Sequence, residues 1–113
     1  MAIPELERAR VVRALRRFCD QVPVEIRHEL VRDFRFERSD VALIERRPHF
    51  QDRSRQIEHV VAKFRYNAKR GAWTLFWPDR NSRWHTYDGF EEKRDFGDLL
   101  REVERDPTGI FFG

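Results

Sequence analysis

The sequence predicts an α+β fold, in which an antiparallel meander sheet of about five strands has N-terminal and C-terminal helices packed on one face. Both ends of the 113-residue chain carry apolar residues at helical spacing, and its middle carries segments in which apolar and polar residues alternate. Short turn sequences separate these segments, which predicts hairpins between neighbouring strands. No stretch is long enough to be an interdomain linker, so residues 1–113 are predicted to form one domain.

The N-terminal segment PELERARVVRALRRFC predicts an amphipathic helix. Pro4 suits the first helical turn, and the acidic Glu5 and Glu7 suit the positive end of the helix dipole. The predicted buried stripe consists of Val11, Val12, Leu15, Phe18 and Cys19. The opposite face carries arginines, namely Arg10, Arg13 and Arg17. A shorter helix is predicted from residue 23 to about residue 30, again with proline at its start.

Five strands are predicted, at residues 31–37, 41–47, 57–66, 72–78 and 83–88. A turn at Arg38 and Ser39 places Arg32 opposite Glu45, where the two side chains form an ion pair. A loop ending at Gly71 closes the next hairpin. Its predicted cross-strand pairs are Tyr66 with Trp73, Phe64 with Leu75 and Ala62 with Trp77. The loop at residues 48–56 is expected to be mobile unless Phe50 packs back onto the domain.

The stretch WTLFWPDRNSRWHTYD, residues 73–88, predicts the last hairpin. If Asn81 and Ser82 form a two-residue turn, Arg80 lies opposite Arg83 and Trp77 opposite Thr86. In that register the core face carries Trp73, Leu75, Trp77, Trp84 and Thr86. The other face carries Thr74, Phe76, Arg80, Arg83, His85 and Tyr87. A slip of one residue would move Arg83 and His85 to the core face.

Apolar residues at helical spacing also predict a C-terminal helix, and they are Phe96, Leu99, Leu100 and Val103. The run ends at Asp106, Pro107 and Gly109. The apolar residues 110–112 that follow are predicted to dock on the sheet of the same chain. Docking on a second copy of the protein is the alternative.

Charge is distributed unevenly along the chain. The net charge is +3, and the segment from residue 91 carries 7 acidic and 4 basic residues, so the first 90 residues carry +3 − (−3) = +6. Of the 23 basic residues 20 are arginine, which suits bidentate binding of phosphate or carboxylate but also follows from codon usage. One cysteine forms no internal disulfide, and no apolar run reaches the length of a membrane span. The absence of a signal-peptide pattern leads us to expect a cytoplasmic protein.

The polar face of the predicted sheet is the candidate binding site. Together with Arg35, its candidate ligand-binding residues are Lys63, Arg65, Asp79, Arg80, Asn81, Arg83, His85 and Tyr87. A basic surface with an aromatic edge is suited to an acidic partner, either nucleic acid or protein. The alternative is a solvated face whose charges keep the protein in solution. A third interpretation is a homo-oligomer, such as a homodimer, that seals exposed aromatic residues.

Enzymatic functions find less support in the residues. Three histidines, at positions 49, 59 and 85, have no metal-ligand spacing among themselves or with Asp52, Asp79 or Asp88, so no metal or other cofactor is predicted. Cys19 lies on the apolar helix stripe and is predicted to be a core residue instead of a nucleophile. The strongest enzyme alternative is a metal-dependent phosphodiester hydrolase. Its signature would be Pro78-Asp79 followed by Glu91-Glu92-Lys93.

The segments ALIERRPHF, VAKFRY, WTLFWPDRNSRWHTYD and the terminal DPTGIFFG together resemble a family of short bacterial proteins described as domain of unknown function 3024. The resemblance runs over nearly the whole chain, and it implies no activity, cofactor or catalytic residue. Two positions differ from the family pattern. Ser82 stands where glycine commonly completes the turn, and Phe112 stands where tryptophan is usual. Since positive φ costs serine more than glycine, the first difference bears on the two-residue turn.

Overall fold

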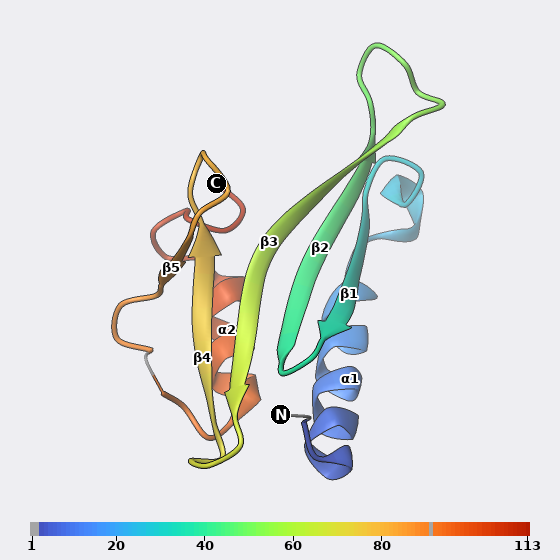
Figure 1. Ribbon diagram of the computed structural model, residues 1–113. Coiled ribbons are helices and arrows are strands. Elements are labelled where there is room, and N and C mark those ends of the chain that lie inside the picture. The colour runs from blue at the N-terminus through green and yellow to red at the C-terminus, as the bar shows by residue number, and fades with distance from the viewer. Residues whose placement is uncertain (1–2, 91) are drawn as a thin grey trace.

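The computed structural model describes residues 3–90 and 92–113 (Figure 1). The chain forms, in order, α1 (Glu5–Cys19), the 3₁₀ turn η1 (Val24–Ile26), β1 (Val31–Glu37), β2 (Asp40–Pro48), β3 (Gln56–Asn67), β4 (Ala72–Pro78), β5 (Trp84–Thr86) and α2 (Phe96–Arg105). The five strands form one sheet in the order β1-β2-β3-β4-β5, and every pair is antiparallel. Both helices pack against the same face of this sheet. The predicted α+β meander is confirmed.

The first helix forms where the apolar spacing predicts it. Val11, Leu15 and Phe18 are buried against the sheet, while the predicted stripe residues Val12 and Cys19 are half-buried. Burial raises the pKa of the Cys19 thiol to about 11, so the group stays protonated at neutral pH. Cys19 therefore behaves as a packing residue.

The predicted second helix is reduced to the single turn η1. Val24 and Ile26, its apolar residues, are exposed. A helix of so few residues is unstable in water unless it buries an apolar face, and this segment buries none of its own residues. The prediction of a helix over residues 23–30 was therefore wrong in length.

The C-terminal helix α2 has a capped start, and the residue at its end anchors the C-terminal tail. The side chain of Asp95 accepts a hydrogen bond from the Gly97 amide at 2.9 Å and caps the start of α2. At the other end, the Asp106 carboxylate accepts hydrogen bonds from the amides of Phe111 (3.0 Å) and Phe112 (2.8 Å). The Phe111 ring is buried against Tyr87, with 5.4 Å between the ring centroids. The tail docks within its own chain, as predicted.

Two of the three predicted hairpin registers are confirmed. In β1 and β2 the pair Arg32–Glu45 is found, with 3.3 Å between Nε and Oε2. In β3 and β4 the pairs Tyr66–Trp73 and Phe64–Leu75 are found, and Ala62–Trp77 lies just past the last paired residues. One register shift interrupts the pairing of β2 with β3 at the step from Leu43 to Ile44, where the chain has one extra residue in β3. Past this bulge, the β2–β3 hairpin extends as an arm beyond the rest of the sheet (Figure 1).

The loop at the tip of this arm leaves Phe50 exposed. The ring is 80% accessible, so it does not pack back onto the domain. It stacks instead on the imidazole of its neighbour His49, with 5.0 Å between the ring centroids. The arm therefore presents an aromatic residue to solvent.

The register of the last hairpin differs from the prediction by one residue. Trp77 pairs with His85 instead of Thr86, and Pro78 pairs with Trp84. The cause is a three-residue loop, closed by a 2.8 Å hydrogen bond from the Asp79 amide to the Arg83 carbonyl, in which Ser82 adopts a φ of 61°. The Asp79 carboxylate fixes this loop by accepting hydrogen bonds from the amides of Asn81 (2.8 Å) and Arg83 (3.0 Å).

This register shift exchanges the faces of the β5 side chains. Trp84, predicted in the core, lies on the face away from the helices, next to Lys63. His85 moves to the side of Trp77, on which it stacks with 4.7 Å between the ring centroids. Tyr87, predicted on the polar face, is only 7% exposed and packs in the core. Arg80 and Arg83 are not a cross-strand pair, because Arg80 belongs to the loop.

Candidate functional site

The outer sheet face is the face turned away from α1 and α2. Its charged and aromatic residues come from all five strands, and they are Asp33, Arg35, Glu37, Asp40, Arg46, Glu58, Lys63, Arg65, Phe76 and Trp84. Four basic and four acidic residues make its net charge +4 − 4 = 0. The face predicted to be basic is thus nearly neutral.

On the β1–β3 half of this face, ion pairs cover the surface. Glu58 pairs with Arg35 and, at 3.2 Å, with Arg46, which in turn lies 2.8 Å from Asp33. Beneath these side chains Ile44 is fully buried although it points away from the helices. The long arginine stems therefore cover apolar surface while their head groups bind carboxylates. This half matches the alternative of a solvated, charge-balanced face.

The ionisation of these groups reflects the same pairing. The hydrogen bond from Arg35 is the main cause that lowers the pKa of Glu58 below its ordinary value. Burial alone would raise the pKa of Asp33, but hydrogen bonds from Arg46 and from the Phe34 amide outweigh it and lower that pKa. The hydrogen bond to Asp33 raises the pKa of Arg46. All of these groups are fully charged at neutral pH.

The β3–β5 half combines cations with aromatic rings. The Lys63 ammonium lies 4.5 Å from the Trp84 ring centroid and 5.4 Å from that of Phe76. Burial lowers the pKa of Lys63, and the attraction of Asp40, 4.0 Å away, opposes that effect. Arg65 donates to both Asp40 oxygens, at 2.8 and 3.2 Å, and its guanidinium carbon lies 5.2 Å from the Phe76 centroid. The Asp40 carboxylate is therefore shared by Lys63 and Arg65.

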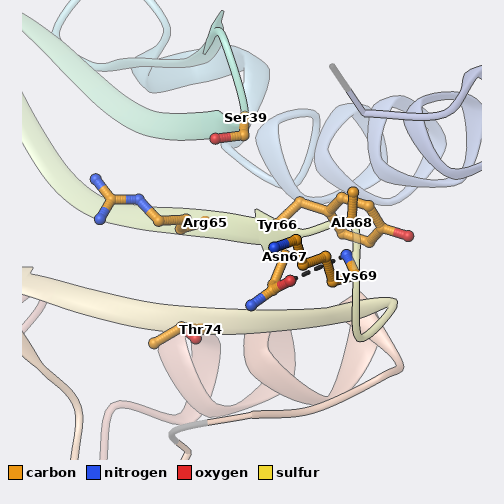
Figure 2. Close-up of a pocket in the computed structure, with 7 residues that line it drawn as sticks. All are labelled: Ser39, Arg65, Tyr66, Asn67, Ala68, Lys69 and Thr74. Atoms are coloured by element: carbon orange, nitrogen blue, oxygen red, sulfur yellow. Dashed lines mark hydrogen bonds between the residues drawn. The ribbon is translucent and has the colours of Figure 1, made fainter. Parts of the chain in front are cut away.

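Next to this cluster a shallow hollow opens at the end of β3 (Figure 2). It has a volume of about 380 Å³. Its lining residues are Ser39, Arg65, Tyr66, Asn67, Ala68, Lys69 and Thr74. Asn67 organises the loop beside it, because its side-chain oxygen accepts hydrogen bonds from the amides of Lys69 (3.0 Å) and Arg70 (3.3 Å). Figure 2 shows the Arg65 head group pointing away from the loop, toward the middle of the sheet.

The β4–β5 loop presents two arginines of a different kind. Arg80 and Arg83 are exposed, and within the described part of the chain neither side chain has a hydrogen-bond, ion-pair or ring partner. The nearby Asp79 carboxylate does not bind them, because it accepts from loop amides and lies 2.7 Å from the Nε2 of His85. The hydrogen bond with His85 is the main cause that lowers the pKa of Asp79, and those with the Arg83 and Asn81 amides add to it.

The predicted site residues thus lie in two places, except for Tyr87. Lys63 and Arg65 meet on the outer face, with Trp84 and Phe76. Asp79, Asn81 and His85 build the loop and its base, while Arg80 and Arg83 project from it. Tyr87 belongs to neither place.

Tyr87 is a correction to the predicted site. Its hydroxyl donates to Glu102 at 2.7 Å, inside the packing between the sheet and α2. Burial is the main cause that raises its pKa to about 12, and the hydrogen bond to Glu102 adds to it. The predicted register placed Trp84 on the core face and therefore missed it as a residue of the outer sheet face. The D-x-N sequence at residues 79–81, in which an aspartate side chain caps its own turn, is the signal that indicates the longer loop.

Of the residues proposed for metal-dependent hydrolysis, Asp79 and Lys93 lie at opposite ends of β4. The backbone of Lys93 pairs with Trp73 near the start of β4, whereas Asp79 follows its end, roughly 20 Å away along an extended strand. Glu91 lies outside the described residues. Among residues 3–90 and 92–113, no three His, Cys, Asp or Glu side chains gather as a metal site. In the same residues no helix has the length and apolar composition to cross a membrane.

The fold and this surface define a small α+β protein whose five-stranded antiparallel meander carries an ion-paired outer face. The chain belongs to the family described as domain of unknown function DUF3024, whose model matches residues 3–113. The resemblance noted in the sequence is thereby confirmed. Neither the curated proteins nor the solved structures include a match to this chain.

Proposed function

We propose that the protein is a binding module that recognises an acidic partner, nucleic acid or protein, at the β4–β5 end of its outer sheet face. The observation that carries this proposal is the pair Arg80 and Arg83, which are exposed and have no partner in the described chain while most cations of the sheet are paired. The whole chain acts as one binding unit, and we place it in the cytoplasm of a bacterial cell.

The chemistry of this end suits an anionic ligand. An unpaired guanidinium keeps all its N–H donors for a phosphate or carboxylate, which it binds through two parallel hydrogen bonds. Trp84 directly follows Arg83 and is only half-buried, so part of its ring is accessible for stacking. Lys63, against the same ring, adds positive charge that Asp40 only partly offsets. Arg80 and Arg83 would make the primary contacts, and Lys63 and Arg65 secondary ones.

Fluorescence anisotropy at low salt, with a labelled single-stranded oligonucleotide and a labelled poly-glutamate peptide, tests this function. We expect binding of at least one probe, with affinity that falls as salt rises. Arg80→Gln with Arg83→Gln should weaken that binding about 10-fold or more, at about 1 kcal/mol per lost charged contact. Arg55→Gln, which removes an exposed cation from the arm loop, should leave it unchanged. No binding of either probe by the wild-type protein would refute the proposal.

One observation favours a second candidate, a homo-oligomer sealed through the arm. Phe50 is exposed beside a groove that also includes Ile57 and Phe112. A second copy that covers this groove would bury these rings and side chains. Light scattering across a concentration series should then show dimers, which Phe50→Ser would dissociate. A monomer at all concentrations would exclude this candidate.

A further inference from the structure

We propose that the outward face of α1 is a separate anion-binding surface, which contacts the sugar-phosphate backbone of nucleic acid through Arg10, Arg13, Arg16 and Arg17. The helix covers the sheet face opposite to the outer sheet face, so this surface does not include the β4–β5 loop (Figure 1). It goes beyond the proposed function, because it adds a second site and fixes the class of its ligand.

The geometry of the helix gathers these arginines on one side. A residue turns about 100° from its neighbour, so the four side chains fall within roughly a third of the helix circumference. Along the axis the first and the last are about 10 Å apart, at about 1.5 Å per residue. That length matches a few consecutive phosphates of a strand, which are about 3.4 Å apart along a duplex.

The arginines of this surface are almost without partners. All four are exposed. Arg10 lies 3.9 Å from Glu7, at the limit of an ion pair. Arg13, Arg16 and Arg17 have neither a carboxylate nor an aromatic partner in the described chain. Their donors are therefore available to a ligand.

The helix also accounts for the whole net charge of the protein. It holds five arginines and two glutamates, which sum to +5 − 2 = +3, and the chain as a whole carries +3. The remaining residues therefore balance to +3 − 3 = 0. A negatively charged polymer is attracted to the place where positive charge is concentrated.

The composition of the surface favours phosphate over other anionic partners. A helix that lies on a membrane needs a free apolar face, but α1 has already buried Val11, Leu15 and Phe18 in the core. Hot spots of protein interfaces combine arginine with well-packed aromatic residues, but the aromatic residue of α1, Phe18, is buried in the core, and Leu6 near one end is its one exposed large apolar residue. Contact with a phosphate backbone requires only positive charge and hydrogen-bond donors.

The shape of the surface agrees with this assignment. A shallow hollow runs along α1, and its lining residues are Glu5, Arg8, Ala9, Val12, Arg13 and Arg16. By helix geometry the short side chains of Ala9 and Val12 lie between Arg8 and Arg13, with Glu5 toward the start of the helix and Arg16 toward its end, so three cations and one carboxylate surround the hollow. A phosphate can therefore approach the helix closely and still reach more than one guanidinium.

A short labelled DNA duplex is the probe for this surface, measured by anisotropy over a salt series. Binding through four phosphate contacts should weaken about 100-fold between about 50 and about 200 mM salt, since each contact contributes about 0.9 to the logarithmic slope. Arg13→Gln with Arg17→Gln should leave a change of only about 10-fold. Glutamine has nearly the helix propensity of arginine, so the thermal melt should be unaltered.

The matched control is Arg80→Gln with Arg83→Gln, which removes the same charge from the β4–β5 loop. Our inference predicts that this pair leaves duplex affinity and its salt slope nearly unchanged. Equal losses in both double variants, or a loss in the loop variant alone, would overturn it while the proposed function stands. A loss in the helix variant alone, with no effect of the loop variant on any probe, would support the inference and refute the proposed site. If the wild-type protein does not bind the duplex but binds phosphatidylserine vesicles, the inference is also overturned.

Discussion

The sequence predicts solvent-facing positions both for the arginines of the outer sheet face and for those of α1. In the structure the two groups differ in whether a carboxylate binds them. Arg35 and Arg46 on the strands bind Glu58, and Arg46 also binds Asp33. Arg13 and Arg17 on the helix have no partner in the described chain. The number of arginines therefore does not locate a binding surface. What matters is whether the fold brings a carboxylate to each one.

The cause of this difference lies in the neighbours that each kind of element provides. Side chains directly opposite each other on paired strands are about 5 Å apart, and Arg46 lies opposite Glu58. On a helix the neighbours are three and four residues away. For Arg13 these are Ala9, Arg10, Arg16 and Arg17. The helix therefore surrounds Arg13 with neutral or like-charged side chains.

The largest expected effect is a loss of stability when the residue that links the sheet to α1 is removed. Trp73 is fully buried between the sheet and the helices, and its Nε1–H donates to Glu7 of α1 at 2.8 Å. Trp73→Ala should lower the free energy of unfolding by about 3–5 kcal/mol, measured by urea titration. Trp73→Phe, which keeps most of the ring, should cost clearly less. A loss below about 1 kcal/mol for alanine would show that α1 is not held through this contact.

A second variant converts paired cations into unpaired ones. Asp40→Asn removes the carboxylate that binds both Arg65 and Lys63. Affinity for the single-stranded oligonucleotide should rise about 10-fold, equivalent to about 1.4 kcal/mol. Glu25→Gln raises the net charge equally from an exposed position in η1, and it should change little. If both variants raise affinity alike, overall charge decides binding and the local pairing does not.

A smaller effect concerns the loop that carries the unpaired Arg80 and Arg83. Ser82 adopts a φ of 61°, which an L-residue with a side chain disfavours. Ser82→Gly should therefore raise the free energy of unfolding by about 1 kcal/mol. Ser82→Ala serves as the control, because alanine keeps the penalty and should give no gain. Destabilisation by glycine in thermal melts would mean that the serine hydroxyl holds the loop.

The smallest expected effect is the acid sensitivity of the paired half. The folded-state pKa values of Asp33 and Glu58 lie below the ordinary 3.8 and 4.5. Such groups stabilise the fold above the ordinary pKa, and this contribution disappears as the pH falls through the folded-state value. Melting temperature should thus fall below about pH 4.5. Asp33→Asn with Glu58→Gln should show a shallower fall, and an identical fall would mean that these pairs add nothing to stability.

The sequence predicts most of the fold because alternation and turns each constrain the register. Phe64 and Tyr66 reach Leu75 and Trp73 in the expected pairs, since a slip there would put charge into the core. For the last hairpin the same argument gave the wrong register, because the observed loop moves His85 to the side of Trp77, where the imidazole stacks on the indole. Trp84 and Tyr87 are both aromatic residues that suit a core position, so their pattern did not correct the error.

The site was less predictable than the fold, for a different reason. Arg35 and Glu58 pair across the sheet although their strands β1 and β3 are separated by β2. Sequence alternation assigns both to one face, but not to each other. The same limit hid the role of Asp40 in neutralising Arg65. Only the three-dimensional arrangement separates satisfied arginines from available ones.

The most direct test of this account is an NMR titration of the arginine Nε–Hε signals with a short DNA oligonucleotide at low salt. Signals of the unpaired arginines, namely Arg13, Arg17, Arg80 and Arg83, should shift as DNA is added. Signals of the carboxylate-bound Arg35, Arg46 and Arg65 should stay in place. Shifts confined to the ion-paired arginines of the outer sheet face, with those of α1 and the loop unchanged, would contradict it.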